Sequence, residues 1–290
     1  MHGPSLAQLG TLLALVALTL VVPGGAKAFA APGPSFSALR AVGAAEVQNV
    51  YVRAPQNAPE GQPLQVLLAL HGMGGNGTDF GNALAAQADA HDWLIIAPTI
   101  SYGDWTDPAQ IVREDPALVA WLSEYVGHLA DRTGYAVAPR VLILGHSRGA
   151  QLALHFTEIH PEQVVAVAAA SAGTYTLPFS LDSQTGLALQ FPFGVADLAT
   201  ADGGQAFDAD TFNSVPVWIG VGSADVNVAD VPHAWDPFIG KDRLKRAQAF
   251  TQALQDLGAN VSLHVFQKTD HTFTDAVRAA GCDALAAALS

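Results

Sequence analysis

The sequence predicts an α/β fold in which a mostly parallel sheet is wrapped by helices on both faces. Short apolar runs of strand length alternate along the chain with longer segments of helical length. Near-continuous apolar runs such as Leu64–Leu70 and Val164–Ala170 are typical of strands buried on both faces. Strands that alternate with helices favour parallel neighbours joined by crossovers. Half of the 290 residues are hydrophobic and only 13% are charged, so the chain can bury a sizeable core.

The expected elements form one domain that runs from residue 46 to residue 290. Its first strand, Val47–Arg53, alternates apolar and polar residues, as an edge strand does. The later strands are expected at Leu64–Leu70, Trp93–Pro98, Val141–Leu144, Val164–Ala170, Val215–Gly222 and Val261–Phe266. Helices are expected at Thr78–Asp92, with Thr78 as its cap, and at Pro116–Arg132, Ala150–Phe156, Asp242–Leu257 and Thr272–Leu289.

Residues 173–214 interrupt this alternation. They are rich in Phe, Leu, Gly and Asp and show no clear periodicity. We interpret them as an insertion near the active-site edge of the sheet. The alternative is a long disordered loop.

The N-terminal 30 residues have the features of an export signal. A mostly apolar run, Leu6–Val22, is followed by small residues, and A-x-A cleavage patterns end at Ala28 and Ala30. We therefore expect residues 1–30 to be a signal peptide and the protein to be secreted or periplasmic. The alternative is an uncleaved membrane anchor, because the run is just long enough to span a bilayer. Residues 31–45, rich in Ala, Gly, Pro and Ser, indicate a linker.

Charge and cysteine content exclude several other features. The formal net charge is −13 at pH 7, whereas nucleic acids and anionic membranes bind clustered Lys and Arg. Neither is expected as a partner. Cys282 is the only cysteine, so no disulfide can form within the chain. The histidines form neither H-x-x-x-H nor H-E-x-x-H, so neither a metal nor another cofactor is expected.

A candidate nucleophile, Ser147, lies at the centre of Gly145-His-Ser-Arg-Gly149. Four apolar residues precede this stretch and a helix-like run follows it, which predicts a strand, a tight turn and a helix. Glycines two residues before and after the serine suit a turn too sharp for side chains on its inner side. The G-x-S-x-G pattern alone arises often by chance, but in this setting it favours catalysis over an ordinary turn.

A serine hydroxyl needs a base and a group that orients the base. Asp225 follows the Val215–Gly222 strand, and His271 follows the last strand, so both lie at carboxyl ends where open α/β sheets bind ligands. Asp230 and Asp236 compete for the role of the acid. His264 competes for that of the base, although it lies in the middle of a strand.

Backbone amides are expected to stabilise the negative charge that forms on a carbonyl oxygen under attack. The stretch His71-Gly-Met-Gly-Gly75 follows a buried strand and can supply one donor, the amide of Met73. The residue after the nucleophile, Arg148, supplies the second. An ordinary strand–helix turn is the alternative interpretation of these glycines.

Together, Leu70–Gly75, Gly145–Gly149, Asp225 and His271 resemble the α/β-hydrolase fold family, over about residues 45–290. The resemblance implies a sheet of about eight strands, a Ser147–His271–Asp225 triad and an oxyanion hole made by the two amides. Within that family the chain is similar to secreted esterases of the polyhydroxybutyrate-depolymerase and feruloyl-esterase kind. This implies a serine esterase, lipase or polyester hydrolase that acts on small or polymeric esters through an acyl-enzyme intermediate.

Aromatic residues are the candidates for substrate binding. Tyr102 and Trp105 lie in a loop after a strand, and Trp235 follows the candidate acid. They are expected to line an apolar groove, or else to pack the insertion onto the body of the protein. Two further functions stay open: a peptidase or amidase that uses the same triad, and a non-catalytic binding protein of this fold.

Overall fold

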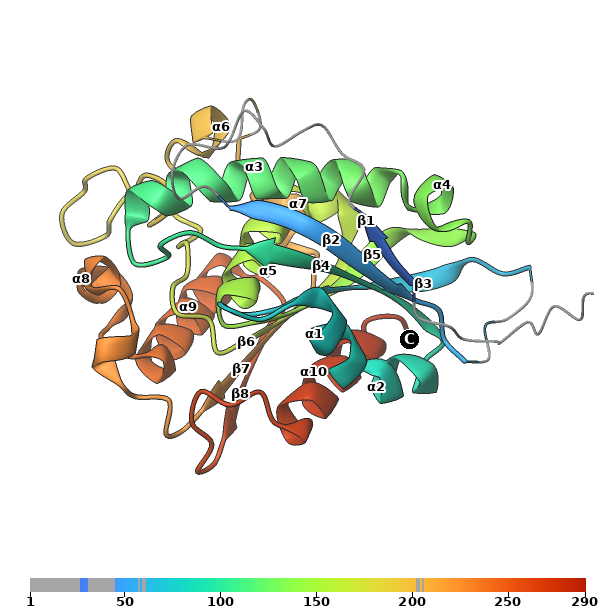
Figure 1. Ribbon diagram of the computed structural model, residues 1–290. Coiled ribbons are helices and arrows are strands. Elements are labelled where there is room, and N and C mark those ends of the chain that lie inside the picture. The colour runs from blue at the N-terminus through green and yellow to red at the C-terminus, as the bar shows by residue number, and fades with distance from the viewer. Residues whose placement is uncertain (1–26, 31–44, 57, 59–60, 202–203, 205) are drawn as a thin grey trace, which may run out of the picture.

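The computed structural model describes residues 27–30, 45–56, 58, 61–201, 204 and 206–290, and contains one sheet of eight strands (Figure 1). Their spatial order is β1-β2-β4-β3-β5-β6-β7-β8. The strands are β1 (Lys27–Ala30), β2 (Glu46–Arg53), β3 (Leu64–Leu70), β4 (Trp93–Ser101), β5 (Val137–His146), β6 (Val164–Ala170), β7 (Val217–Gly222) and β8 (Val261–Phe266). Only β2 pairs antiparallel, with β1 and β4. The mostly parallel sheet is confirmed.

Helices cover both faces of this sheet (Figure 1). One layer consists of α3 (Pro108–Gly127), α5 (Arg148–Ile159) and α9 (Arg243–Leu257), and the other of α1 (Gly77–Ala83), α2 (Ala85–Ala90) and α10 (Asp275–Ala287). Short helices are α4 (Leu129–Thr133), α6 (Leu198–Ala201), α7 (Ala209–Asn213) and α8 (Asp236–Ile239). Each layer buries its own apolar cluster, with Phe156 and Phe250 in the first and Leu84 and Val277 in the second.

All five expected helices begin at other residues than the sequence suggested, and two of them also differ in extent. The segment Thr78–Asp92 contains two helices, and Asn76, not Thr78, caps the first by accepting a hydrogen bond from the Asp79 amide at 2.8 Å. The segment Pro116–Arg132 is divided between α3, which starts at Pro108 after Asp107 as its cap, and the short helix α4. Pro116 thus lies inside α3 and does not start a helix.

The N-terminal predictions fall mostly outside the described residues. Of the expected signal peptide, residues 1–30, the structure describes only β1. Of the expected linker, residues 31–45, it describes only Ala45. Because β1 pairs with β2, β2 is not the edge strand that its alternating pattern suggested. Within the described residues, no helix combines the length and the apolar character needed to cross a membrane.

Where residues 173–214 are described, they pack onto the body of the protein. Tyr175, Phe191, Leu198 and Phe212 are all buried, which contradicts the alternative of a disordered loop there. Its first residues lie next to α5 and α9, because Thr174 accepts a hydrogen bond from Gln151 and Tyr175 stacks on Phe250. The loops at the carboxyl edge of the sheet, around Ser147, are those after β3, β4, β5, β7 and β8.

Candidate active site

Ser147 lies in a sharp turn between β5 and α5. Its backbone has φ 56° and ψ −119°, a region that residues other than glycine rarely adopt. The flanking glycines allow this turn. A Cβ atom on Gly145 would lie 2.3 Å from the carbonyl oxygen of Gly149, and one on Gly149 would lie 2.1 Å from that of Leu70. Close packing of β3, β5 and α5 thus requires the G-x-S-x-G pattern.

Ser147, His271 and Asp225 are joined by hydrogen bonds. Nε2 of His271 lies 2.9 Å from Oγ of Ser147, and Nδ1 of His271 lies 2.9 Å from Oδ2 of Asp225. The structure therefore brings together the three residues that the sequence singled out as nucleophile, base and acid. With Nδ1–H donating to the carboxylate, Nε2 is the nitrogen that can accept the serine proton.

The loops that carry the acid and the base lie side by side. The amide of Ser223 donates to the carbonyl oxygen of Phe266, and that of Ala224 donates to Thr269, each at 2.9 Å. A Cβ atom on Gly222 would lie only 2.0 Å from the Thr269 oxygen. This close approach fixes the position of Asp225 relative to His271.

The three competing residues make other contacts. Asp230 accepts a hydrogen bond from Asn227 at 2.7 Å, and Asp236 pairs with Arg246 at 2.8 Å. His264 is exposed on β8. None of these side chains contacts Ser147 or His271 in the described structure.

The second carboxylate oxygen of Asp225 accepts a hydrogen bond from Arg243, a residue that the sequence analysis missed. Nη1 of Arg243 lies 3.2 Å from Oδ1 of Asp225, and Nη2 donates to the carbonyl oxygen of Asp230 at 2.6 Å. Arg243 is the first residue of α9, where the helix dipole disfavours a cation. That unusual position was the signal in the sequence.

The glycine-rich loop after β3 lies against the nucleophile. A Cβ atom on Gly72 would be 3.1 Å from that of Ser147. The buried imidazole of His71 holds this loop: its Nε2 accepts from the Ile100 amide at 2.9 Å, so Nδ1 carries the proton and donates to the Gly72 carbonyl at 2.7 Å. Burial lowers the pKa of His71, which favours this neutral form. Met73 follows and lines the cavity beside Ser147.

The backbone and the side chain of Arg148 point to different parts of the protein. It is the first residue of α5, so its backbone N–H has no partner within the helix and can serve as a donor. Its buried side chain points away and pairs with Asp115. Burial raises the pKa of Asp115, but the Arg148 charge and a 2.5 Å hydrogen bond from His155 outweigh it and lower the pKa to about 2. The side chain is thus an anchor between α5 and α3.

His146 packs beside the candidate base. Its ring centroid lies 5.1 Å from that of His271 and 4.8 Å from that of Phe273. Burial, and next the charge of His271, lower the pKa of His146 to about 3. His146 is therefore neutral in ordinary buffers and does not compete with His271 for a proton.

A cavity of about 470 Å³ opens over Ser147. Its lining residues include Met73, Trp105, His146, Arg243 and His271. None of them comes from residues 173–214, so the expected insertion does not wall this cavity. Of the three aromatic residues expected to bind substrate, Trp105 alone lines it.

Tyr102 and Trp235 are placed differently from the prediction. Trp235 is only 1% exposed and packs against Phe193, so it belongs to the core and cannot meet a substrate. The Tyr102 hydroxyl donates to the carbonyl oxygen of His71 at 3.2 Å, behind the glycine-rich loop. Trp235 therefore fits the alternative interpretation, in which these residues pack the insertion onto the body, whereas Tyr102 contacts the glycine-rich loop.

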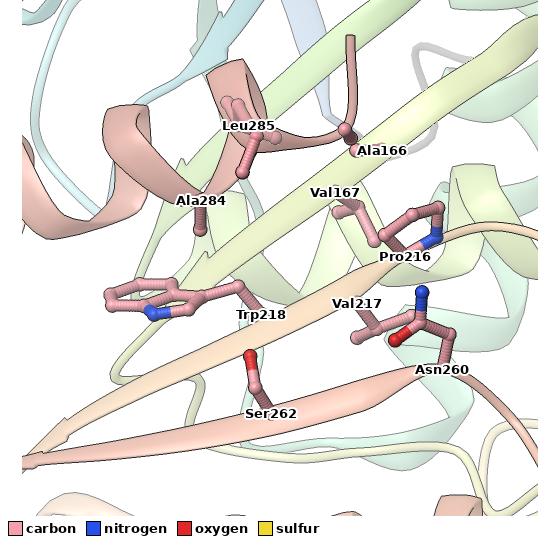
Figure 2. Close-up of a pocket in the computed structure, with 11 residues that line it drawn as sticks. Ala166, Val167, Pro216, Val217, Trp218, Asn260, Ser262, Ala284 and Leu285 are labelled. Atoms are coloured by element: carbon pink, nitrogen blue, oxygen red, sulfur yellow. The ribbon is translucent and has the colours of Figure 1, made fainter. Parts of the chain in front are cut away.

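A second cavity, of about 290 Å³, lies near the amino ends of β6 and β7 (Figure 2). Ala284 and Leu285 on α10 cover one side of it, and Trp218 lines the other (Figure 2). Its polar side chains are Asn260 and Ser262, with no histidine among the lining residues. Of these two cavities, the one over Ser147 contains a serine in contact with a histidine. Among the described residues no cluster of His, Cys, Asp or Glu is suited to hold a metal ion.

A family model described as "Putative esterase" matches residues 45–279. The chain belongs to this esterase family. The match spans β2 to the start of α10 and includes Ser147, Asp225 and His271, so the protein is an esterase-type hydrolase. No curated protein is a significant match to the chain.

Solved structures of hydrolases share the fold. A poly(aspartic acid) hydrolase from Sphingomonas is 20% identical with a TM-score of 0.62, and the alignment covers 91% of this chain and 98% of that one. A poly(3-hydroxybutyrate) depolymerase from Bordetella parapertussis is 22% identical with a TM-score of 0.57, over 80% and 82% of the two chains. An S-formylglutathione hydrolase from Agrobacterium tumefaciens is 17% identical with a TM-score of 0.59, over 92% and 95%. These structures support the α/β-hydrolase fold of the esterase.

Proposed function

We propose that this esterase hydrolyses carboxylic esters with Ser147 as its nucleophile. The observation that carries the proposal is a pair of hydrogen-bond contacts, each 2.9 Å long. One joins Ser147 Oγ to His271, and the other joins His271 to Asp225. A hydroxyl becomes a useful nucleophile only when a neighbouring base removes its proton, and this geometry provides that base.

In the proposed reaction, Ser147 Oγ attacks the ester carbonyl while its proton passes to Nε2 of His271. Asp225 holds the ring and stabilises the imidazolium. His271 then protonates the departing alcohol, which leaves an acyl group on Ser147. A water molecule attacks this acyl-enzyme, giving its proton to His271, and the acid is released as Ser147 regains its proton.

The negative charge on the carbonyl oxygen is assigned to the backbone amides of Met73 and Arg148. Support comes from the close approach of Gly72 to Ser147 and from the position of Arg148 at the start of α5. One such donor typically contributes about 3 kcal/mol to transition-state stabilisation. No metal or organic cofactor takes part in these steps.

The shape of the cavity favours short acyl groups or exposed polymer chains. It is open, and no described residue of the 173–214 segment covers it. Trp105 offers an aromatic wall and Met73, 43% exposed, an apolar rim. The name of the poly(3-hydroxybutyrate) depolymerase neighbour makes a polyester the polymer to test first.

Export through residues 1–30 is part of the proposal. Cleavage after Ala30 would remove β1, because this strand spans Lys27–Ala30, and β2 would then become the edge of the sheet. The N-terminal residue of the protein recovered from its native host decides this point. An intact N-terminus on membrane-bound protein would indicate the anchor instead.

Hydrolysis of p-nitrophenyl esters from acetyl to palmitoyl tests the ester function. We expect a rate that peaks at short chains and is lost in Ser147→Ala, while Ser262→Ala on β8 stays fully active. A peak at long chains would indicate a lipase. Absence of ester hydrolysis, with activity on matched amides, would replace the proposal by a peptidase or amidase.

A further inference from the structure

The two carboxylate oxygens of Asp225 accept hydrogen bonds from two different side chains. Its Oδ2 receives the hydrogen bond from His271, and its Oδ1 receives one from Arg243. Asp225 and Arg243 are 2% and 3% exposed. A guanidinium is always charged, so a buried cation lies on the far side of the acid that orients the base.

Arg243 also ties together several parts of the cavity wall. Its second nitrogen donates to the Asp230 carbonyl at 2.6 Å, and its guanidinium carbon lies 5.9 Å from the centre of the Trp105 ring. Arg243 itself lines the cavity above Ser147. The side chain therefore joins α9, the loop after β7 and the loop after β4.

Helix stability does not explain the residue at this position. The first turn of α9 holds Arg243, Lys245 and Arg246, although a helix N-terminus favours negative charge. Asp242 caps the helix by accepting from the Lys245 amide at 2.8 Å, so Arg243 is not needed as a cap. Among the described residues, Asp225 is the carboxylate with which Arg243 forms an ion pair.

We propose that Arg243 is a positioning residue of the triad, which fixes the carboxylate of Asp225 and shares its charge. This inference rests on the proposed serine mechanism. A shared carboxylate stabilises the imidazolium of His271 less than an unshared one does. Without Arg243 the full carboxylate charge acts on the ring, so a variant that lacks Arg243 is expected to lose activity at a higher pH than the wild-type protein does.

The other ionisable groups around His271 do not alter this reasoning. His146 from β5, with its pKa lowered to about 3 by burial and the charge of His271, does not titrate between pH 4 and 9. Asp270, next in the chain, accepts from the Thr272 amide at 3.1 Å and keeps this contact whether or not Arg243 is present. Asp230 faces this region through its carbonyl, which accepts from Arg243.

The test is the pH dependence of kcat/KM for p-nitrophenyl acetate between pH 4 and 9, with samples quenched and read at alkaline pH. The acid midpoint is the pH at which kcat/KM falls to half of its plateau. For Arg243→Gln we expect this midpoint to rise by about one pH unit, with kcat about tenfold lower. Lys245→Gln removes an equal charge from the same helical turn and is expected to leave both unchanged.

An unchanged acid midpoint in folded, active Arg243→Gln would overturn the inference, because a merely structural role moves no midpoint. If this variant does not fold, Arg243→Lys decides: we expect the wild-type midpoint with a lower kcat, and an unchanged kcat would contradict positioning. Ser147→Ala separates the two proposals. If the serine mechanism is wrong, folded Ser147→Ala keeps the wild-type rate. If only the inference about Arg243 is wrong, Ser147→Ala is inactive while Arg243→Gln keeps the wild-type midpoint.

Discussion

The hydroxyl of Tyr102 donates a hydrogen bond to the carbonyl oxygen of His71 at 3.2 Å. The Tyr102 ring also lies against the guanidinium of Arg148, with 4.9 Å between the guanidinium carbon and the ring centre. One side chain thus contacts both segments that supply the proposed oxyanion donors. It connects the glycine-rich loop to the start of α5.

Tyr102→Phe is therefore expected to lower kcat for short esters by about fivefold, the value of one hydrogen bond, with little change in KM. The ring contact with Arg148 is kept, so the melting temperature should move little. Tyr135→Phe, which lies just before the start of β5, serves as the control. Equal kcat for the two variants would show that the Tyr102 hydroxyl does not position the loop.

Asp115→Asn removes the buried partner of Arg148 and is expected to destabilise the protein by about 3–5 kcal/mol in denaturant unfolding at pH 7. The pKa of Asp115 is lowered to about 2, so its stabilising effect is present above pH 4 and is lost as the pH falls towards 2. The difference between wild type and variant should shrink over the same range. Asp131→Asn, exposed on α4, should have almost no effect; a similar loss in both variants would argue against the ion pair.

Glu158→Gln is expected to stabilise the protein at alkaline pH. Burial, and next the charge of Asp115, raise the pKa of Glu158 well above its usual value, and its Oε2 is buried without a hydrogen bond. Above about pH 4.5 this carboxyl ionises in the unfolded chain but stays protonated in the folded protein. The free energy of unfolding therefore falls as the pH rises. Melting curves should show a gain on the order of 1 kcal/mol at pH 8 and none at pH 4. Glu162→Gln is the exposed control, and a gain that is independent of pH would contradict the explanation.

Gly149→Ala and Gly127→Ala form a matched pair of helical substitutions. A Cβ atom at position 149 would lie 2.1 Å from the Leu70 oxygen, whereas one at position 127 meets nothing within 4 Å. We expect Gly149→Ala to lose several kcal/mol of stability together with activity. Gly127→Ala should be neutral or up to about 1 kcal/mol more stable. Thermal unfolding measures both, and a stable, active Gly149→Ala would show that the turn can relax.

Much of the fold and the triad could be predicted because they follow from local patterns. The runs Val164–Ala170 and Val261–Phe266 became strands with those bounds. Carboxyl ends of parallel strands share one edge, so Ser147, Asp225 and His271 were expected to meet there.

The errors arose where a tertiary contact decides the structure. Trp235 follows the acid in sequence and looked suited to a groove, but the Phe193 ring and the Tyr175 carbonyl hold it in the core. Arg243 contacts Asp225, which lies 18 residues earlier in the chain, and the spacing of the two residues does not predict this contact. The expected helix at Pro116 starts eight residues earlier, at Pro108, because Asp107 caps α3 there.

The most direct test of the serine mechanism is intact-protein mass spectrometry after reaction with a fluorophosphonate, followed by peptide mapping. We expect one adduct per chain, on Ser147, with slower labelling in His271→Gln and none in Ser147→Ala. An adduct on another residue, or ester hydrolysis that persists in folded Ser147→Ala, would contradict it.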